Sequence, residues 1–150
     1  MRAVVQRVRH AMVRVDDEVV GQIGAGFLVF VGAGQGDDEA AADALAEKIV
    51  HLRVFEDDAG KMNRSLQDVD GELLVVSQFT LFGDCRKGRR PSFIEALEPL
   101  RAEALVARVI ECARNLGVRR VASGRFRATM AVELCNDGPV TLLVDTNKAF

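Results

Sequence analysis

The chain has 150 residues, of which 49% are hydrophobic and 28% charged, a balance typical of one globular domain over residues 1–150. Its longest apolar runs, residues 26–31 and 73–76, are far shorter than the roughly 20 residues that span a bilayer. Charges at Arg2, Arg7 and Arg9 interrupt any apolar leader. We therefore expect a cytoplasmic protein with no membrane partner.

The charged residues nearly balance, with 20 Lys and Arg against 22 Asp and Glu, which excludes a protein that coats nucleic acid through its global charge. Any contact with a polyanion must be local. The three cysteines, Cys85, Cys112 and Cys135, form no C-x-x-C pair, so reduced thiols are expected. Neither His10 nor His51 has a second ligand at metal-binding spacing, and no zinc site is predicted.

In the first half of the chain, apolar segments separated by acidic and glycine turns predict four strands in antiparallel hairpins, at residues 3–8, 12–15, 19–23 and 27–31. From residue 37 the apolar residues recur at helical spacing behind an acidic first turn, which predicts a helix to about residue 51. The glycine-rich residues 32–36 lack the lysine and the spacing of a phosphate loop, so a plain connection is favoured.

In the second half, the polar residues 56–71 predict a long surface connection with at most a short strand, followed by a strand over residues 73–81. Pro99 and Gly117 are typical of the first turn and the C-terminal cap of a helix, and a second helix is predicted between them. Residues 130–134 and 140–144 predict two strands joined by a turn over residues 136–139. The order of elements indicates a mixed α/β fold with a largely antiparallel sheet.

Three polar residues, Ser77, Gln78 and Thr80, interrupt the apolar run of residues 73–82. A buried polar group without a hydrogen-bond partner costs about 1–3 kcal/mol. These side chains therefore either bond to neighbouring backbone at the end of the strand or face a ligand pocket. No G-x-S-x-G or S-x-x-K pattern surrounds the hydroxyls and histidine is scarce, which disfavours a covalent nucleophile at Ser77 or Thr80.

Two loops offer further chemistry. Gly138 before Pro139 forms a rigid corner, which either joins two strands or presents carbonyl oxygens to an ammonium group. Four cations lie within five residues, so this run is either a solvated loop or a phosphate-binding segment: Arg86, Lys87, Arg89 and Arg90. The adjacent Cys85 is interpreted as an incidental loop thiol.

Residues 77–81 (SQFTL) and 136–141 (NDGPVT) closely resemble the two signature motifs of the D-aminoacyl-tRNA deacylase family, and are called here the first and second signature segments. The likeness extends in order to residues 1–8, 55–57 with 60–63, 86–93 and 124–126. The resemblance implies a single domain with a barrel-like sheet and two main amphipathic helices. The sequence departs from the family pattern at Phe82, Gly83 and Cys85, and at Arg127, where glycine is common.

The resemblance also implies an activity, which is hydrolysis of the ester that joins a D-amino acid to the 3′-terminal adenosine of tRNA, without metal or organic cofactor. It implies a homodimer whose active sites lie at the subunit interface, where the first signature segment of one chain faces the Gly138–Pro139 corner of the other. The family's Gly-Pro bond is cis, and its carbonyl oxygens hold the substrate's α-amino group while excluding L side chains. Glycyl-tRNA passes because glycine has no side chain.

The same resemblance assigns roles to individual residues. Catalysis is expected at Gln78, Phe79 and Thr80, where backbone N–H groups near Phe79 stabilise the oxyanion and the RNA's 2′-hydroxyl assists the attack. Arg7 is expected to brace the corner, and the remaining substrate-binding residues are Ser77, Gly138, Pro139, Asn136, Thr141, Phe126 and Met130. The phosphates of tRNA are expected to contact Arg86, Lys87, Arg89 and Arg90.

Three other functions stay open from the sequence. The first is a nucleic-acid-binding protein of the same fold without hydrolytic activity, although DNA is not the expected partner. The second is a related deacylase with relaxed chirality and a trans Gly-Pro bond. The third is a dimeric α/β domain that binds another small amine, which leaves the basic run at residues 86–90 unexplained.

Overall fold

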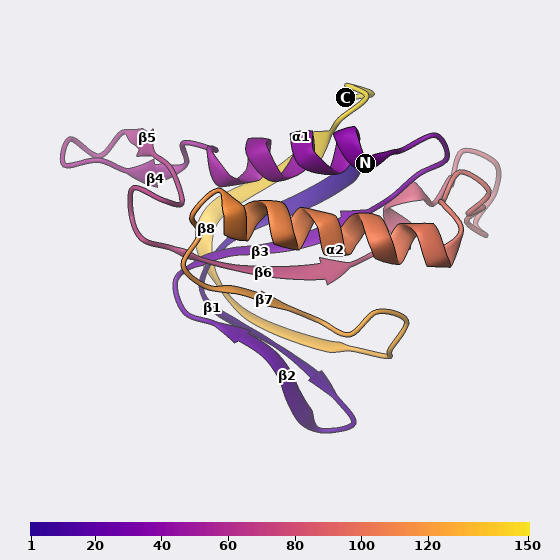
Figure 1. The fold of residues 1–150 in the computed structure, drawn as a ribbon, viewed down its shortest axis with the longest axis horizontal. Helices are drawn as coiled ribbons and strands as arrows, with labels where there is room; N and C mark the ends of the chain where they lie inside the picture. The colour runs from indigo at the N-terminus through magenta and orange to yellow at the C-terminus, as the bar shows by residue number, and fades with distance from the viewer.

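The computed structural model describes all 150 residues. Figure 1 shows a strongly curved β-sheet with the helices α1 and α2 lying side by side across one of its faces. In chain order the elements are β1 (Arg2–Val15), β2 (Glu18–Ile23), β3 (Gly26–Gly32), α1 (Glu39–Val50), β4 (Phe55–Glu56), β5 (Met62–Arg64), β6 (Glu72–Ser77), the 3₁₀ helix η1 (Phe79–Phe82), α2 (Pro99–Asn115), β7 (Val121–Ser123) and β8 (Ala131–Asp145).

The long strand β1 organises the sheet. It pairs antiparallel with β8 along its whole length, and on its other side with β3 and then with β2. Beyond β3 the order continues to β6 and β7, and both of these pairings are parallel, which the sequence did not predict. The sheet curls until β2 lies against β7. The two strands approach so closely that a Cβ atom at Gly21 would lie 2.3 Å from the carbonyl oxygen of Ser123. The predicted barrel-like, largely antiparallel sheet is thus confirmed.

The core consists of two apolar clusters on opposite faces of the sheet. Phe27 and Val29 of β3 face the larger cluster beneath the helices, whereas Leu28 packs with Leu74 and Val76 of β6 in a smaller cluster on the opposite face. Both strands are therefore buried on both sides, as parallel strands usually are. This double burial explains why residues 26–31 and 73–76 are continuously apolar rather than alternating.

The helices begin and end close to the predicted positions. The Asp38 side chain accepts a hydrogen bond of 2.9 Å from Ala41 N and so caps α1. Glu98 caps α2 in the same way, Pro99 occupies the first helical position, and Gly117 lies beyond the end with φ +99°. No helix is long and apolar enough to cross a membrane.

A charged contact on the outer surface joins the two helices. Arg108 of α2 donates two hydrogen bonds, of 2.7 and 2.8 Å, to the Asp43 carboxylate of α1, and these bonds lower the pKa of Asp43 to about 2. Partial burial raises the pKa of the neighbouring Cys112 thiol, whose Sγ donates to Asp43 Oδ1 over 2.8 Å. All three cysteines are free thiols, as predicted.

The strand boundaries differ from the prediction in three places. Residues 3–15 form one strand rather than two, and residues 131–145 form one strand in which the predicted turn is a bulge. Between the pairs Gln6↔Thr141 and Val8↔Asn136, residues 137–140 of β8 stand opposite the single residue 7 of β1. Residues 137–140 therefore bulge out of β8, while β8 stays paired with β1 on both sides of them. The predicted strand over 73–81 ends at Ser77, and η1 replaces its last part.

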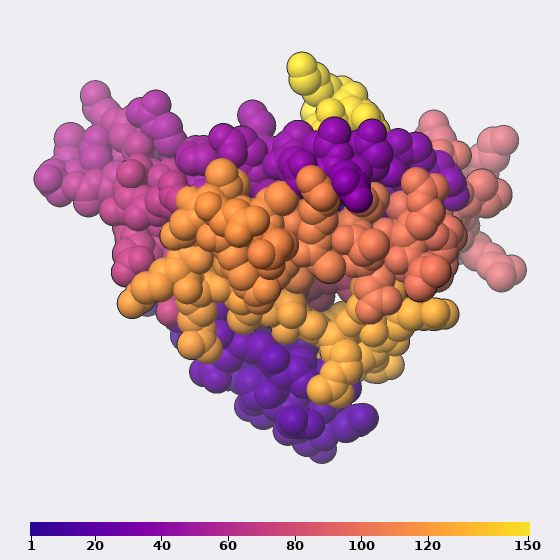
Figure 2. Space-filling model, viewed as in Figure 1, coloured from indigo at the N-terminus to yellow at the C-terminus, as the bar shows by residue number.

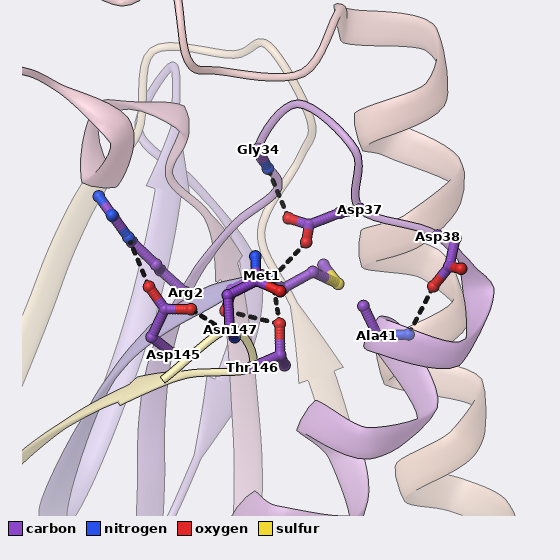
Figure 3. Close-up of polar contacts among 9 residues, drawn as sticks. All are labelled: Met1, Arg2, Gly34, Asp37, Asp38, Ala41, Asp145, Thr146 and Asn147. Atoms are coloured by element: carbon purple, nitrogen blue, oxygen red, sulfur yellow. Dashed lines mark hydrogen bonds and ion pairs between the residues drawn. The ribbon is translucent and has the colours of Figure 1, made fainter. Parts of the chain in front are cut away.

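The start of the chain is buried in a polar cluster drawn in Figure 3. Met1 is fully buried. Its N-terminal ammonium group donates hydrogen bonds to Asp37 Oδ1 over 2.7 Å and to the hydroxyl of Thr146. The second Asp37 oxygen accepts a 2.7 Å hydrogen bond from Gly34 N. The Gly34 N–H group is thus already bonded to Asp37 and does not face a ligand. The glycine-rich residues 32–36 form a structural connection, as favoured from the sequence.

Candidate active site

A pocket of about 740 Å³ opens at the C-terminal ends of β3 and β6. Its other walls are the first turns of α2 and the loop that leads into β8, and Figure 2 shows the hollow between these two segments. The lining includes Val31–Ala33 of β3 and its extension, residues 76–79, Phe93, residues 96–99, Ala102, Val106, residues 126–128, Met130 and Val132. Ligand sites in sheets with parallel strands commonly lie at this edge.

The first signature segment forms one rim of this pocket. Gln78 N donates to Val31 O over 2.7 Å, which continues the β3–β6 ladder past the end of β6. Gly32 allows this close approach, because a Cβ atom there would lie 2.7 Å from Gln78 O. The chain then turns into η1, and the amide groups of Phe79 and Thr80 at its start have no acceptor within the chain. The rim therefore presents free N–H donors.

The side chains of this segment differ in what they face. Ser77, Gln78 and Phe79 line the pocket, so the ligand-facing interpretation of this strand end is the one that the geometry favours. Thr80 does not line the pocket; it is exposed, and its hydroxyl accepts a hydrogen bond from Gln78 Nε2. No histidine lines the pocket, and no group of three or more His, Cys, Asp or Glu side chains is arranged to hold a metal ion.

The loop before β8 supplies the opposite wall. Phe126 and Met130, which the resemblance assigns to the wall for adenosine, both line the pocket and are half-buried. The Met130 sulfur packs so closely on Gly124 that a Cβ atom there would lie 2.6 Å from it. These side chains form an apolar wall suited to the face of a base.

The second signature segment lies in the bulge of β8, away from the pocket of its own chain, since none of its residues lines that pocket. Gly138 and Pro139 are exposed, and the peptide bond between them is cis, as the resemblance implies. Arg7, only 7% exposed, donates from Nε to Asp137 O over 3.0 Å and from its other end to Val54 O. The guanidinium thus joins the corner to the segment before β4.

Gln6 was not among the residues singled out from the sequence. Its amide group donates to Asn136 Oδ1, and its carbonyl oxygen accepts a 2.5 Å hydrogen bond from the Thr141 hydroxyl. One side chain therefore ties together two of the expected substrate-binding residues. The signal in the sequence was a polar residue inside the apolar residues 3–8, but that signal does not indicate which strand supplies the hydrogen-bond partners.

The four cations of the basic run are not equivalent. Arg86 is committed to Asp84 through two hydrogen bonds of 2.9 and 2.7 Å, which lower the pKa of the Asp84 carboxyl to about 2. The other three, Lys87, Arg89 and Arg90, are exposed and make no hydrogen bond or ion pair with the rest of the chain. These three cations are therefore unpaired.

The base of this loop is attached to the rim of the pocket. Asp84 and Ser92 exchange backbone hydrogen bonds of 2.8 and 2.9 Å and close the loop. The next residue, Phe93, lines the pocket and packs edge-to-face on Phe79 with ring centroids 5.2 Å apart. The basic run therefore projects from the edge of the pocket.

Comparisons with known proteins show the family of this chain. The family model described as D-Tyr-tRNA(Tyr) deacylase matches residues 4–145. Proteins named D-aminoacyl-tRNA deacylase from Symbiobacterium thermophilum and Thermotoga petrophila are 59% and 55% identical over 150 residues; these alignments cover 100% of this chain and 99% and 100% of the relatives. The fold is therefore that of a tRNA-deacylase type of domain, and the chain belongs to the D-tyrosyl-tRNA deacylase family.

Two solved structures share the fold. One, described as c-Myc DNA Unwinding Element Binding Protein, superimposes with a TM-score of 0.91 and 39% identity, over 97% of this chain and 98% of the other. Another, described as a probable eukaryotic D-amino acid tRNA deacylase, gives a TM-score of 0.80 at 20% identity, over 95% and 97% of the two chains. The second likeness supports the architecture alone.

Proposed function

We propose that this protein hydrolyses D-aminoacyl-tRNA to a free D-amino acid and tRNA. The observation that carries the proposal is the rim of free backbone N–H groups at Phe79 and Thr80, set beside an apolar pocket in a chain of the D-tyrosyl-tRNA deacylase family. The names of relatives that are 52–60% identical point to the same reaction. This substrate class places the reaction in the cytoplasm.

In the proposed reaction, water attacks the ester carbonyl and the bond to the terminal 3′-oxygen breaks. The water oxygen stays on the amino acid, and a proton passes to the 3′-oxygen that leaves. The rim amides stabilise the negative charge on the carbonyl oxygen, a contribution that typically accelerates such reactions by a factor of about 10² to 10³. The neighbouring 2′-hydroxyl of the RNA assists the attack, since no histidine lines the pocket.

We further propose that selection against L-aminoacyl-tRNA requires a second copy of the chain. Within one chain the exposed Gly138–Pro139 corner does not reach the pocket lining, and β8, which carries the corner, pairs only with β1. In a homodimer, the corner of one subunit would lie across the pocket of the other. Its carbonyl oxygens would bind the substrate ammonium and leave no room for an L side chain, whereas D-residues and glycine would fit.

The proposal is tested by incubating the protein with D-tyrosyl-tRNA, L-tyrosyl-tRNA and glycyl-tRNA in parallel and following the release of amino acid. We expect hydrolysis of the D- and glycyl-esters and little loss of the L-ester. Equal rates on both tyrosyl enantiomers would indicate the related deacylase with relaxed chirality. Light scattering at the assay concentration reports whether the active species is a dimer.

A second candidate function is nucleic-acid binding without hydrolysis. It is favoured by the structural neighbour described as a DNA unwinding element binding protein and by the three free cations of residues 87–90. Under this alternative the protein binds uncharged tRNA or DNA and releases no amino acid from any ester. The same incubation, combined with a binding assay on DNA, distinguishes the two functions.

A further inference from the structure

Arg127 occupies a backbone position that disfavours it. Residues 125–128 form a turn closed by a 3.2 Å hydrogen bond from Ala128 N to Arg125 O. Arg127 is the third residue of this turn and has φ +63°, whereas Phe126 before it does not have a positive φ. This combination is that of a type II turn, whose third position favours glycine. The turn itself does not explain an arginine there.

Arg127 is also unusual among the charged residues that line the pocket. Only two residues that line the pocket are charged at neutral pH, Glu98 and Arg127. The Glu98 carboxylate caps α2 by accepting hydrogen bonds of 2.9 and 2.8 Å from Leu100 N and Arg101 N. Arg127 makes no hydrogen bond or ion pair anywhere in the chain, and its side chain is exposed. It is therefore the one uncommitted charge in the pocket lining.

We propose that Arg127 binds the phosphate group that precedes the terminal nucleoside of the substrate, an inference that rests on the proposed function. Its immediate neighbours in the lining, Phe126, Ala128 and Met130, are apolar and suit a nucleoside. A nucleoside held against them carries its 5′-phosphate on the sugar, outside the apolar wall. Arg127 lines the pocket next to this wall and its side chain is exposed, so its guanidinium is available to bind phosphate oxygens with paired donors.

This role differs from that of the basic run. Lys87, Arg89 and Arg90 project from the loop behind Phe93 and do not line the pocket, so they reach phosphates farther along the RNA. Arg127 acts next to the bound nucleoside and is a binding residue that does not touch the ester. Its removal is expected to weaken substrate binding while the rate at saturation stays close to that of the wild type.

The test compares two substrates and three variants. The substrates are D-tyrosyl-tRNA and the D-tyrosyl ester of adenosine, which has the nucleoside but no phosphate. Arg127→Gly suits the left-handed backbone, and Arg127→Lys keeps the charge. The control is Arg125→Ala, which removes an arginine of the same turn that is exposed but does not itself line the pocket. Steady-state kinetics over a range of salt concentrations and thermal melts are measured for each.

We expect Arg127→Gly to raise KM for D-tyrosyl-tRNA by about 5- to 10-fold, with kcat within about twofold of the wild type. The slope of log affinity against log salt should fall by about 0.7, the value for one phosphate contact on a single strand. On the adenosine ester, kcat/KM should change by less than about twofold. Arg127→Lys should keep the salt slope, and Arg125→Ala should resemble the wild type in every measurement.

Two results would overturn the inference: equal losses on both substrates, which would make Arg127 a structural residue, and an unchanged salt slope in Arg127→Gly. The melting temperature separates folding defects from binding defects, and Arg127→Gly is expected to melt no lower than the wild type because glycine favours this conformation. A wild-type protein that hydrolyses neither ester would instead refute the proposed function, and that result is obtained before any variant is compared.

Discussion

The two signature segments are held in place in opposite ways. The first follows β6, a strand buried on both faces, and ends in a rim whose backbone donors are free and whose Phe79 is 56% exposed. The second lies in the bulge of β8, at the edge of the sheet, and is anchored by the nearly buried side chain of Arg7. The first segment presents free N–H donors, whereas the second presents an exposed cis Gly-Pro corner.

This difference shows how the proposed chemistry is divided. Under the proposed function, the N–H groups of the first segment stabilise the oxyanion, and the carbonyl groups of the corner bind the ammonium at the other end of the aminoacyl ester. Since the corner does not line the pocket of its own chain, the proposed homodimer would complete each site with the corner of the other subunit. We expect changes at the corner to affect folding and chirality together, and changes at the rim to affect rate with little loss of stability.

The largest effect is expected for Arg7→Ala. Arg7 bonds to two carbonyl groups, Asp137 O and Val54 O, and a hydrogen bond to a charged group contributes about 1.5–3 kcal/mol. The variant should lose about 3 kcal/mol in the free energy of unfolding, measured by urea titration, and should lose discrimination between the enantiomers. Arg7→Lys keeps the charge but not both donors, and its free energy of unfolding should lie between those of the wild type and Arg7→Ala. An unchanged urea midpoint would show that the corner is held by other contacts.

The rim is tested by removing a single N–H group. Phe79 begins η1, a position where proline fits because no intrahelical bond is removed, so Phe79→Pro deletes the donor and leaves the turn in place. We expect kcat to fall about 100-fold with a small change in melting temperature. Phe79→Ala is the matched control, because it keeps the amide and removes the ring, and its kcat should stay within a few-fold of the wild type. A proline variant as active as the alanine variant would exclude this amide from catalysis.

The basic run should contribute to binding alone. Replacing Arg89 and Arg90 together by Ala should raise KM for tRNA and reduce the salt slope by roughly 0.7 to 0.9 for each phosphate that the variant no longer binds, with kcat little changed. Arg86→Ala is the control, because Arg86 is already paired with Asp84, and a smaller change in slope is expected. An unchanged slope with a dissociated dimer, detected by light scattering, would make the two arginines structural.

The smallest effect is expected for Thr80→Ala. The Thr80 hydroxyl is exposed, lies outside the pocket lining and bonds only to Gln78. The variant should keep kcat within about threefold of the wild type, whereas a substrate that lacks the terminal 2′-hydroxyl should react far more slowly. An inactive variant, normal turnover of the deoxy substrate and a trapped acyl-enzyme would together establish Thr80 as a covalent nucleophile.

The local patterns of the sequence predicted both helices and most strands, because capping residues and apolar periodicity act over a few residues. Pro99 with Gly117 and the acidic residues before α1 are signals of this kind, and the structure confirms them. The same local reasoning misplaced the ends of β6 and divided β1 and β8 in two. A bulge and a continuous ladder depend on a partner strand more than 100 residues away, which no local pattern records.

By itself, the sequence determined the family, the apolar strands and the residues of the two signature segments, since these are properties of residue type and order. Only the tertiary structure decided that β6 lies parallel to β3 and β7, that Gln6 joins Asn136 to Thr141, and that Arg86 is occupied while Arg127 is free. The physical reason is that hydrogen bonds and ion pairs are selected by proximity in space. A charged side chain binds the nearest suitable partner, and the tertiary structure decides which partner is nearest.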